Sequence, residues 1–69
     1  MNNTIRQLRK AKKLSQEELA NLCQVTRQTI NAIENNKYDP TLKLAFDMAF
    51  VLDTTVDKLF LYENTIYEK

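Results

Sequence analysis

The fold is decided by residues 16–35, which read QEELANLCQVTRQTINAIEN. Ser15 and Thr26 each come directly before a run of residues with the apolar spacing of a helix. A hydroxyl at such a position accepts a hydrogen bond from a free backbone N–H of the first helical turn. Ser15 and Glu18 also match the capping-box pattern S-x-x-E. This stretch therefore predicts two short helices joined by a tight turn.

Apolar spacing along the rest of the chain extends this unit to five helices. Their expected bounds are residues 4–13 after an Asn3 cap, 16–23, 27–35, 42–52, and 56–60 after a Thr55 cap. The side chains expected in the core are Ile5, Leu8, Leu19, Ala20, Leu22 or Cys23, Val25, Ile30, Ile33, Leu44, Ala45, Met48, Ala49, Leu52, Val56, Leu59 and Phe60. The tail, residues 61–69, has strand-favouring residues and no helical stripe. We expect it to be extended or to form a small β element.

The composition is that of one small globular domain spanning residues 1–69. The chain is 43% hydrophobic and contains one cysteine, no histidine and no glycine. These counts exclude a disulfide within the chain, make a zinc site unexpected and remove phosphate-binding loops built on glycine. No nucleophile–base pair is visible, so we expect neither an enzyme nor a cofactor. No apolar run resembles a signal peptide or a membrane span, which predicts a cytoplasmic protein without a membrane partner.

The charges are divided unevenly along the chain, although the net charge is only +1. Residues 1–43 carry eight Lys and Arg against four acidic residues, whereas residues 44–69 carry two against five. A basic half suits contact with the phosphates of a nucleic acid. We therefore expect the first half of the chain to meet nucleic acid and the acidic half to serve another contact.

A cluster of polar side chains opens the third predicted helix, whose buried side is formed by Ile30 and Ile33. The side chains on its other side are Arg27, Gln28, Thr29 and Asn31. In a DNA major groove, Arg pairs with guanine O6 and N7, and Gln or Asn pairs with adenine N6 and N7. The methyl group of a Thr packs against thymine. We predict that these four side chains contact bases.

Four segments, in the same order, resemble the Xre/Cro-type helix-turn-helix family of phage and bacterial repressors. They are LSQEELA at 14–20, VTRQTI at 25–30, AIENNKY at 32–38 and DPTLKLA at 39–45. The resemblance covers most of the chain and implies an all-α fold, a five-helix lambda-repressor-like DNA-binding domain with a short C-terminal extended or β tail. Among stand-alone members, the chain is most similar to the small repressors of cytolysin operons.

The resemblance also implies roles for individual residues. The phosphate contacts that it implies are Gln16, Thr26, Asn36 and Lys37. Gln16 would also brace Gln28. Arg9 and Glu34 stand where the family often joins its first and third helices by a partly buried ion pair. Gln24 replaces the usual glycine of the turn between the two helices, so we expect a left-handed backbone at Gln24.

The tail places bulky apolar residues beyond an already complete five-helix core. Packing on the same chain and a seam between two copies both remain open for these residues. The predicted dimer interface consists of Val56, Leu59, Phe60, Leu61, Tyr62, Ile66 and Tyr67. One module of this kind buries only about 600–1,000 Å² on DNA, which is too little to discriminate a specific site from the rest of a genome. A homodimer is therefore expected, because it doubles the contacts.

These observations predict a homodimeric, sequence-specific transcriptional repressor that binds double-stranded DNA at an inverted repeat. A regulatory partner protein is left open. An antitoxin of the same fold, which binds a toxin and autoregulates its operon, is the nearest alternative. A protein-interaction module that has lost DNA binding is the second alternative.

Overall fold

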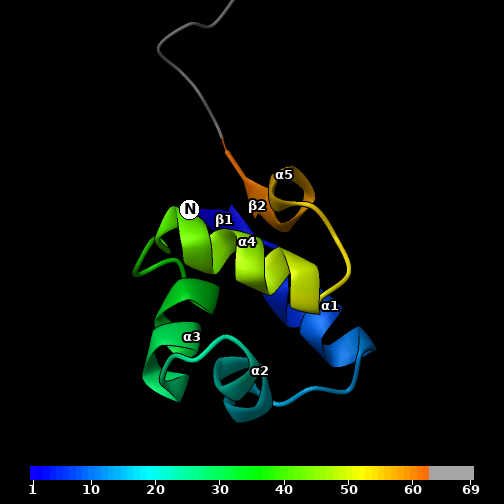
Figure 1. Cartoon of the computed structure of the whole chain (residues 1–69). Helices are drawn as coiled ribbons and strands as arrows, with labels where there is room; N and C mark the ends of the chain where they lie inside the picture. The colour runs from blue at the N-terminus through cyan, green and yellow to red at the C-terminus, as the bar shows by residue number, and fades with distance from the viewer. Residues whose placement is uncertain (63–69) are drawn as a thin grey trace, which may run out of the picture.

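Five helices and one pair of short antiparallel strands make up residues 1–62, the part of the chain that the computed structural model describes (Figure 1). The elements in chain order are β1 (Asn2–Asn3), α1 (Ile5–Ala11), α2 (Gln16–Leu22), α3 (Arg27–Glu34), α4 (Leu42–Val51), α5 (Val56–Leu59) and β2 (Phe60–Leu61). All five predicted helices are therefore confirmed: four start at the predicted residue, and the other ends lie within two residues of the prediction. Within residues 1–62, none of these helices is long and apolar enough to cross a membrane.

Side-chain caps start three of the helices. The Ser15 hydroxyl accepts a bond of 3.0 Å from the Glu18 N–H, and the Glu18 carboxylate accepts one of 2.8 Å from the Ser15 N–H. Thr26 caps α3 and Thr41 caps α4 through the hydroxyl alone, which accepts from the N–H of Thr29 and of Leu44. The capping box and the Thr26 cap predicted from the sequence are confirmed.

The start of α1 differs from the prediction. Asn3 lies in β1, and its side-chain oxygen accepts a bond of 3.1 Å from the N–H of Ile5, where the helix begins. Thr4 occupies the position before the helix and uses its hydroxyl to donate to Lys58 O at 3.1 Å. Strand pairing holds Asn2 and Asn3 extended, which explains why α1 starts one residue later than expected.

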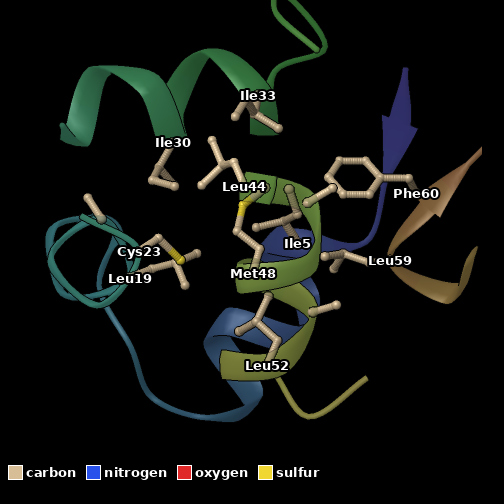
Figure 2. Close-up of a cluster of buried hydrophobic side chains, with 13 residues drawn as sticks. Ile5, Leu19, Cys23, Ile30, Ile33, Leu44, Met48, Leu52, Leu59 and Phe60 are labelled. Atoms are coloured by element: carbon tan, nitrogen blue, oxygen red, sulfur yellow. The ribbon is translucent and has the colours of Figure 1, made fainter. Parts of the chain in front are cut away.

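One cluster of apolar side chains fills the space between the helices. Its members are Ile5, Leu19, Ala20, Cys23, Ile30, Ile33, Leu44, Ala45, Met48, Ala49, Leu52, Leu59 and Phe60. Figure 2 shows Leu44 and Met48 of α4 pointing toward Ile30 of α3. Of the two candidates at the end of α2, Cys23 is buried, whereas Leu22 is 58% exposed. Burial raises the pKa of the Cys23 thiol, so it packs as a neutral side chain.

The extended tail is confirmed for its first residues, but its partner strand was not predicted. β2 pairs antiparallel with β1 at the other end of the chain, with Asn3 opposite Phe60 and Asn2 opposite Leu61. The prediction that Phe60 ends a helix is wrong, because it lies in β2, and its ring is only 6% exposed. The rest of the predicted tail, including Ile66 and Tyr67, lies outside the described residues.

Four helices end on a left-handed residue that is not glycine. Lys13, Gln24, Asn36 and Asp53 have φ of 59°, 59°, 62° and 57°. After each of them, the next residue donates its N–H back to the last turn; for example, the Val25 N–H bonds Ala20 O at 3.0 Å. This bond is typical of helix ends that glycine usually closes. Because the chain has no glycine, other residues adopt this conformation, and the prediction for Gln24 is confirmed.

The substitution Gln24→Gly should leave the free energy of unfolding unchanged or raise it by up to about 1 kcal/mol, because glycine has no Cβ to oppose a positive φ. As a matched control, Gln7→Gly at an exposed position within α1 should lower it by about 1 kcal/mol. Urea unfolding of the two variants checks both values. A clear loss of stability in Gln24→Gly would contradict the steric account of this turn.

Candidate nucleic-acid interface

The first two turns of α3 present polar side chains on the outside of the molecule. The α3 side chains that face inward, Ile30 and Ile33, are almost completely buried. Arg27, Gln28 and Asn31 are exposed and together line a shallow hollow on the opposite side. We call these three side chains the α3 ridge. The structure thus brings together three of the four residues that were predicted to contact bases.

Thr29, the fourth, lies beside the ridge and not on it. It is half-buried, and its hydroxyl is 3.1 Å from the hydroxyl of Thr26. It lines a different hollow, together with Tyr38 and Lys43. Its position leaves it at the margin of the surface that Arg27 and Gln28 form.

A buried carboxylate lies directly beneath the C-terminal half of α3. The Glu34 side chain is 0% exposed, and Arg9 Nε donates to its Oε2 at 2.7 Å. Arg9 Nη2 donates to Glu34 Oε1 at 3.3 Å, and Arg9 Nη1 donates to Leu14 O at 2.8 Å. The ion pair between the first and third helices has therefore formed as expected.

Arg6 and Gln16 complete the set of donors to Glu34. Arg6 Nε donates to Glu34 Oε1 at 3.4 Å, and its Nη2 donates to Asn35 Oδ1 at 3.2 Å. Gln16 Nε2 donates to Glu34 Oε1 at 3.2 Å. The part played by Arg6 was missed from the sequence, although Arg6 and Arg9 are three residues apart and so share one face of α1.

Hydrogen bonds between side-chain amide groups connect this buried carboxylate with the α3 ridge. Asn31 Nδ2 donates to Gln16 Oε1 at 3.3 Å, and Asn35 Nδ2 donates to Asn31 Oδ1 at 3.2 Å. The expectation that Gln16 braces Gln28 is wrong: its oxygen bonds Asn31. The reason is geometric, because Asn31 is three residues before Glu34 and lies on the same side of α3. Gln28 is nearly two turns away from Glu34.

The pKa of Glu34 is set by opposing effects. Burial of the carboxylate raises the pKa. Hydrogen bonds from Arg9, Gln16 and Arg6, together with the charge of Arg9, lower the pKa by more than burial raises it. The net result is a pKa below the usual value of a glutamate. Glu34 is therefore ionised in the folded protein at neutral pH, and the charge stabilises the packing of α3.

The predicted phosphate contacts lie around the ridge in different situations. Thr26 and Lys37 are exposed, and the Thr26 hydroxyl also caps α3. Asn36 is exposed, but its side chain is tied to β1: its Nδ2 donates to Asn2 Oδ1 at 3.1 Å, and its Oδ1 accepts from Asn3 Nδ2 at 3.2 Å. Half-buried Gln16 supports Asn31 from beneath.

The predicted dimer residues divide into two groups. Leu59 and Phe60 are buried in the core of their own chain, with 0% and 6% exposure, so their assignment to an interface between copies is corrected. They pack inward because β2 pairs with β1 and covers the core. Val56 is half-buried, whereas Leu61 and Tyr62 are exposed.

Replacing Glu34 with Gln should destabilise the protein by about 3 kcal/mol at pH 7, because it leaves the charge of Arg9 buried and unpaired. The loss should shrink as the pH falls below the usual pKa of a glutamate, about 4.3, where the unfolded wild type takes up a proton. It should be smallest below the lowered pKa of Glu34 in the folded protein, where the carboxyl group is neutral in both states. The measurement is urea unfolding at pH 7 and at pH 3. Glu17→Gln, at an exposed position of α2, is the control and should change stability by less than about 0.5 kcal/mol. A difference between wild type and Glu34→Gln that does not change with pH would contradict this role of the charge.

A sequence profile and similar curated proteins point to the same family. The sequence profile described as "Helix-turn-helix" matches residues 5–59. An uncharacterized HTH-type transcriptional regulator of Methanothermobacter thermautotrophicus is 50% identical over 65 residues, which cover 93% of this chain and 94% of that protein. A second such regulator, from Methanocaldococcus jannaschii, is 45% identical over 64 residues, covering 93% of this chain and 97% of the relative.

Solved structures agree with these relatives. The restriction-modification controller protein C.AhdI from Aeromonas hydrophila superposes with a TM-score of 0.74 at 36% identity, over 81% of this chain and 85% of C.AhdI. The N-terminal DNA-binding domain of the biofilm regulator SinR from Bacillus subtilis gives 0.74 at 33% identity, over 99% and 100%. The five-helix fold, the α2–α3 unit and the matched profile lead to one conclusion: the chain belongs to the Xre-type helix-turn-helix family of transcriptional regulators.

Proposed function

We propose that this protein is a sequence-specific repressor that binds double-stranded DNA in the cytoplasm as a homodimer, at an inverted repeat near a promoter. The observation that carries the proposal is the α3 ridge: Arg27, Gln28 and Asn31 stand exposed around one hollow on a helix whose opposite side is fixed by the core. Repression would follow from exclusion of RNA polymerase from the occupied promoter.

The chemistry of the ridge suits the base edges of a major groove. Arg27 can donate two bonds to guanine O6 and N7, and the amide of Gln28 can pair with adenine N6 and N7. Asn31 is held in place by Gln16 and Asn35, each through one bond, which leaves one N–H and one oxygen lone pair for adenine. Thr29, at the margin, supplies at most a methyl contact to thymine.

Residues around the ridge supply the contacts to phosphate. Thr26 and Lys37 flank α3 and are exposed, so they are suited to hold the DNA backbone. The side chains of Asn36 and Gln16 already form hydrogen bonds within the protein. Their contacts with phosphate would be additional hydrogen bonds. Such contacts set the register of the protein on the duplex without reading its sequence.

A homodimer follows from the size of the domain. One module that buries about 600–1,000 Å² on DNA contacts too few bases for high discrimination, and two modules read half-sites about 34 Å apart on one side of the duplex. The relatives above are named as transcriptional regulators, which supports regulation and gives no support to the antitoxin alternative. The particular similarity to the small repressors of cytolysin operons stays a prediction.

Selection of bound duplexes from a random pool, followed by sequencing, tests the proposal. The expected result is an enriched motif with two-fold symmetry. Gln28→Ala and Asn31→Ala should each weaken binding of the dimer to that motif by about 30-fold or more, because each variant loses one base-reading side chain in both protomers, at about 1–3 kcal/mol per side chain. Gln7→Ala, at an exposed position of α1, is the control and should bind like the wild type. Wild-type affinity in the Gln28→Ala, Asn31→Ala double variant would refute base reading by α3.

The salt dependence of binding tests the electrostatic part separately. About eight phosphate contacts in the dimer imply a slope near −7 in a plot of log affinity against log salt concentration. Lys37→Ala should reduce the magnitude of the slope by about 2, one unit for each protomer, without changing the enriched motif. Fluorescence anisotropy at several salt concentrations gives this slope. A flat response would contradict phosphate binding.

A further inference from the structure

The outer face of α4 carries three large apolar side chains that the core does not cover. Leu42, Phe46 and Phe50 are 72%, 58% and 86% exposed. They are four residues apart along the helix and therefore form one stripe. Leu44, Met48 and the other buried residues of α4 point instead into the core (Figure 2). Contiguous exposed apolar patches are uncommon on small soluble proteins and mark surfaces that contact another molecule.

The stripe continues at both ends onto other exposed apolar groups. Leu22 and Phe50 line one shallow hollow, together with Val51. At the other end, Leu42 lines a hollow with Met1 and Val56. Figure 1 shows α4 lying between α3 and α5, and the two hollows lie at its two ends.

We infer that this surface, centred on Phe46, is the contact between two copies of the chain, with the two α4 helices packed antiparallel. The inference rests on the homodimer of the proposed function and assigns its surface. An antiparallel pair related by a two-fold axis places Phe46 against its own copy and Leu42 of each chain against Phe50 of the other. The stripe is therefore complementary to itself, as a two-fold interface requires.

The charges beside the stripe favour the antiparallel arrangement. Lys43 and Asp47 lie on the same flank of α4 and are joined by a bond of 2.7 Å. With the two-fold axis at Phe46 and a rise of 1.5 Å per residue, Lys43 of each copy is about 3 Å along the helix axis from Asp47 of the other. The two Asp47 are also about 3 Å apart along the axis, and the two Lys43 are about 9 Å apart. A parallel pair would place each charge beside its like charge. The antiparallel pair thus has two close pairs of opposite charge and one of like charge, whereas the parallel pair has two of like charge, so the antiparallel direction is favoured.

The extent of the surface indicates a weak, reversible dimer. An interface built around three side chains of one helix and their neighbours lies at the lower end of specific interfaces, below about 1,200 Å² in total. None of Arg27, Gln28 and Asn31 belongs to the stripe, so two copies can pair through α4 while each keeps its α3 ridge exposed. DNA with two half-sites then stabilises the pair.

Sedimentation equilibrium across the micromolar range, without DNA, tests the inference. The wild type should associate to a dimer, and Phe50→Asp should weaken association about 30-fold or more, because it puts a charge into the apolar contact once in each copy. Leu42→Asp should act in the same direction. Leu61→Asp in β2 tests the interface that the sequence predicted for the tail; if α4 is the contact, this variant should leave the dimerisation constant within about threefold of the wild type. Circular dichroism checks that each variant is folded.

A charge exchange tests the direction of packing. Lys43→Glu and Asp47→Lys should each dimerise more weakly than the wild type, because each places like charges across the seam. An equimolar mixture of these two variants should form a heterodimer, since the two acidic positions of one chain then face the two basic positions of the other. The double variant K43E/D47K should regain the wild-type dimerisation constant.

The outcomes separate this inference from the proposed function. A wild-type dimer that Phe50→Asp leaves intact, or that Leu61→Asp dissociates instead, overturns the α4 interface and leaves the homodimer standing. A wild type that stays monomeric and binds a duplex with two half-sites no better than one with a single half-site overturns both. Dimerisation through α4 without any enriched DNA motif would support the interface and refute the repressor.

Discussion

The orientation of α3 depends on one buried interaction, the ion pair between Arg9 and Glu34. The carboxylate loses its contact with water and is compensated by donors from Arg9, Arg6 and Gln16. These donors come from α1 and from the first residue of α2, so a single side chain connects three helices. A buried charge tolerates little displacement because each lost donor leaves part of it unpaired. Glu34 therefore fixes how α3 sits on the rest of the domain.

That constraint reaches the functional surface through Gln16. Its amide donates to Glu34 and accepts from Asn31, so the side chain of Asn31 is already oriented in the free protein. A side chain that is ordered before binding loses less conformational entropy when DNA binds. Arg27 and Gln28 stand one turn earlier on α3 and share the hollow with Asn31. In the proposed function, the ridge thus combines one side chain that is held in place, Asn31, with two that can adapt to the base edges.

Local signals in the sequence were enough for the helices and much of the core. Ser15, Thr26 and the positive φ of Gln24 each depend on a few neighbouring residues, and all three were predicted correctly. Contacts between distant residues were not predictable in this way. The pairing of Asn3 with Phe60 joins the two ends of the described chain, and nothing in either short segment indicates the other. Likewise, the bond from Asn31 to Gln16 depends on how α2 and α3 pack. Leu42, Phe46 and Phe50 recur every four residues on the outer side of α4. The buried residues of α4 already explain why this segment is a helix, so the outer spacing alone did not indicate a second contact.

The central claim is that the outward side chains of α3 read bases while Glu34 holds the helix in place. The most direct test is a titration with a selected duplex, followed by NMR of the side-chain amides and backbone N–H groups. The account predicts that the largest shifts occur at Thr26 to Asn31, including the side-chain amides of Gln28 and Asn31, and that Asn31 shifts less when Gln16 is replaced by Ala. Unchanged amides at Gln28 and Asn31, with the strongest shifts elsewhere in the domain, would contradict it.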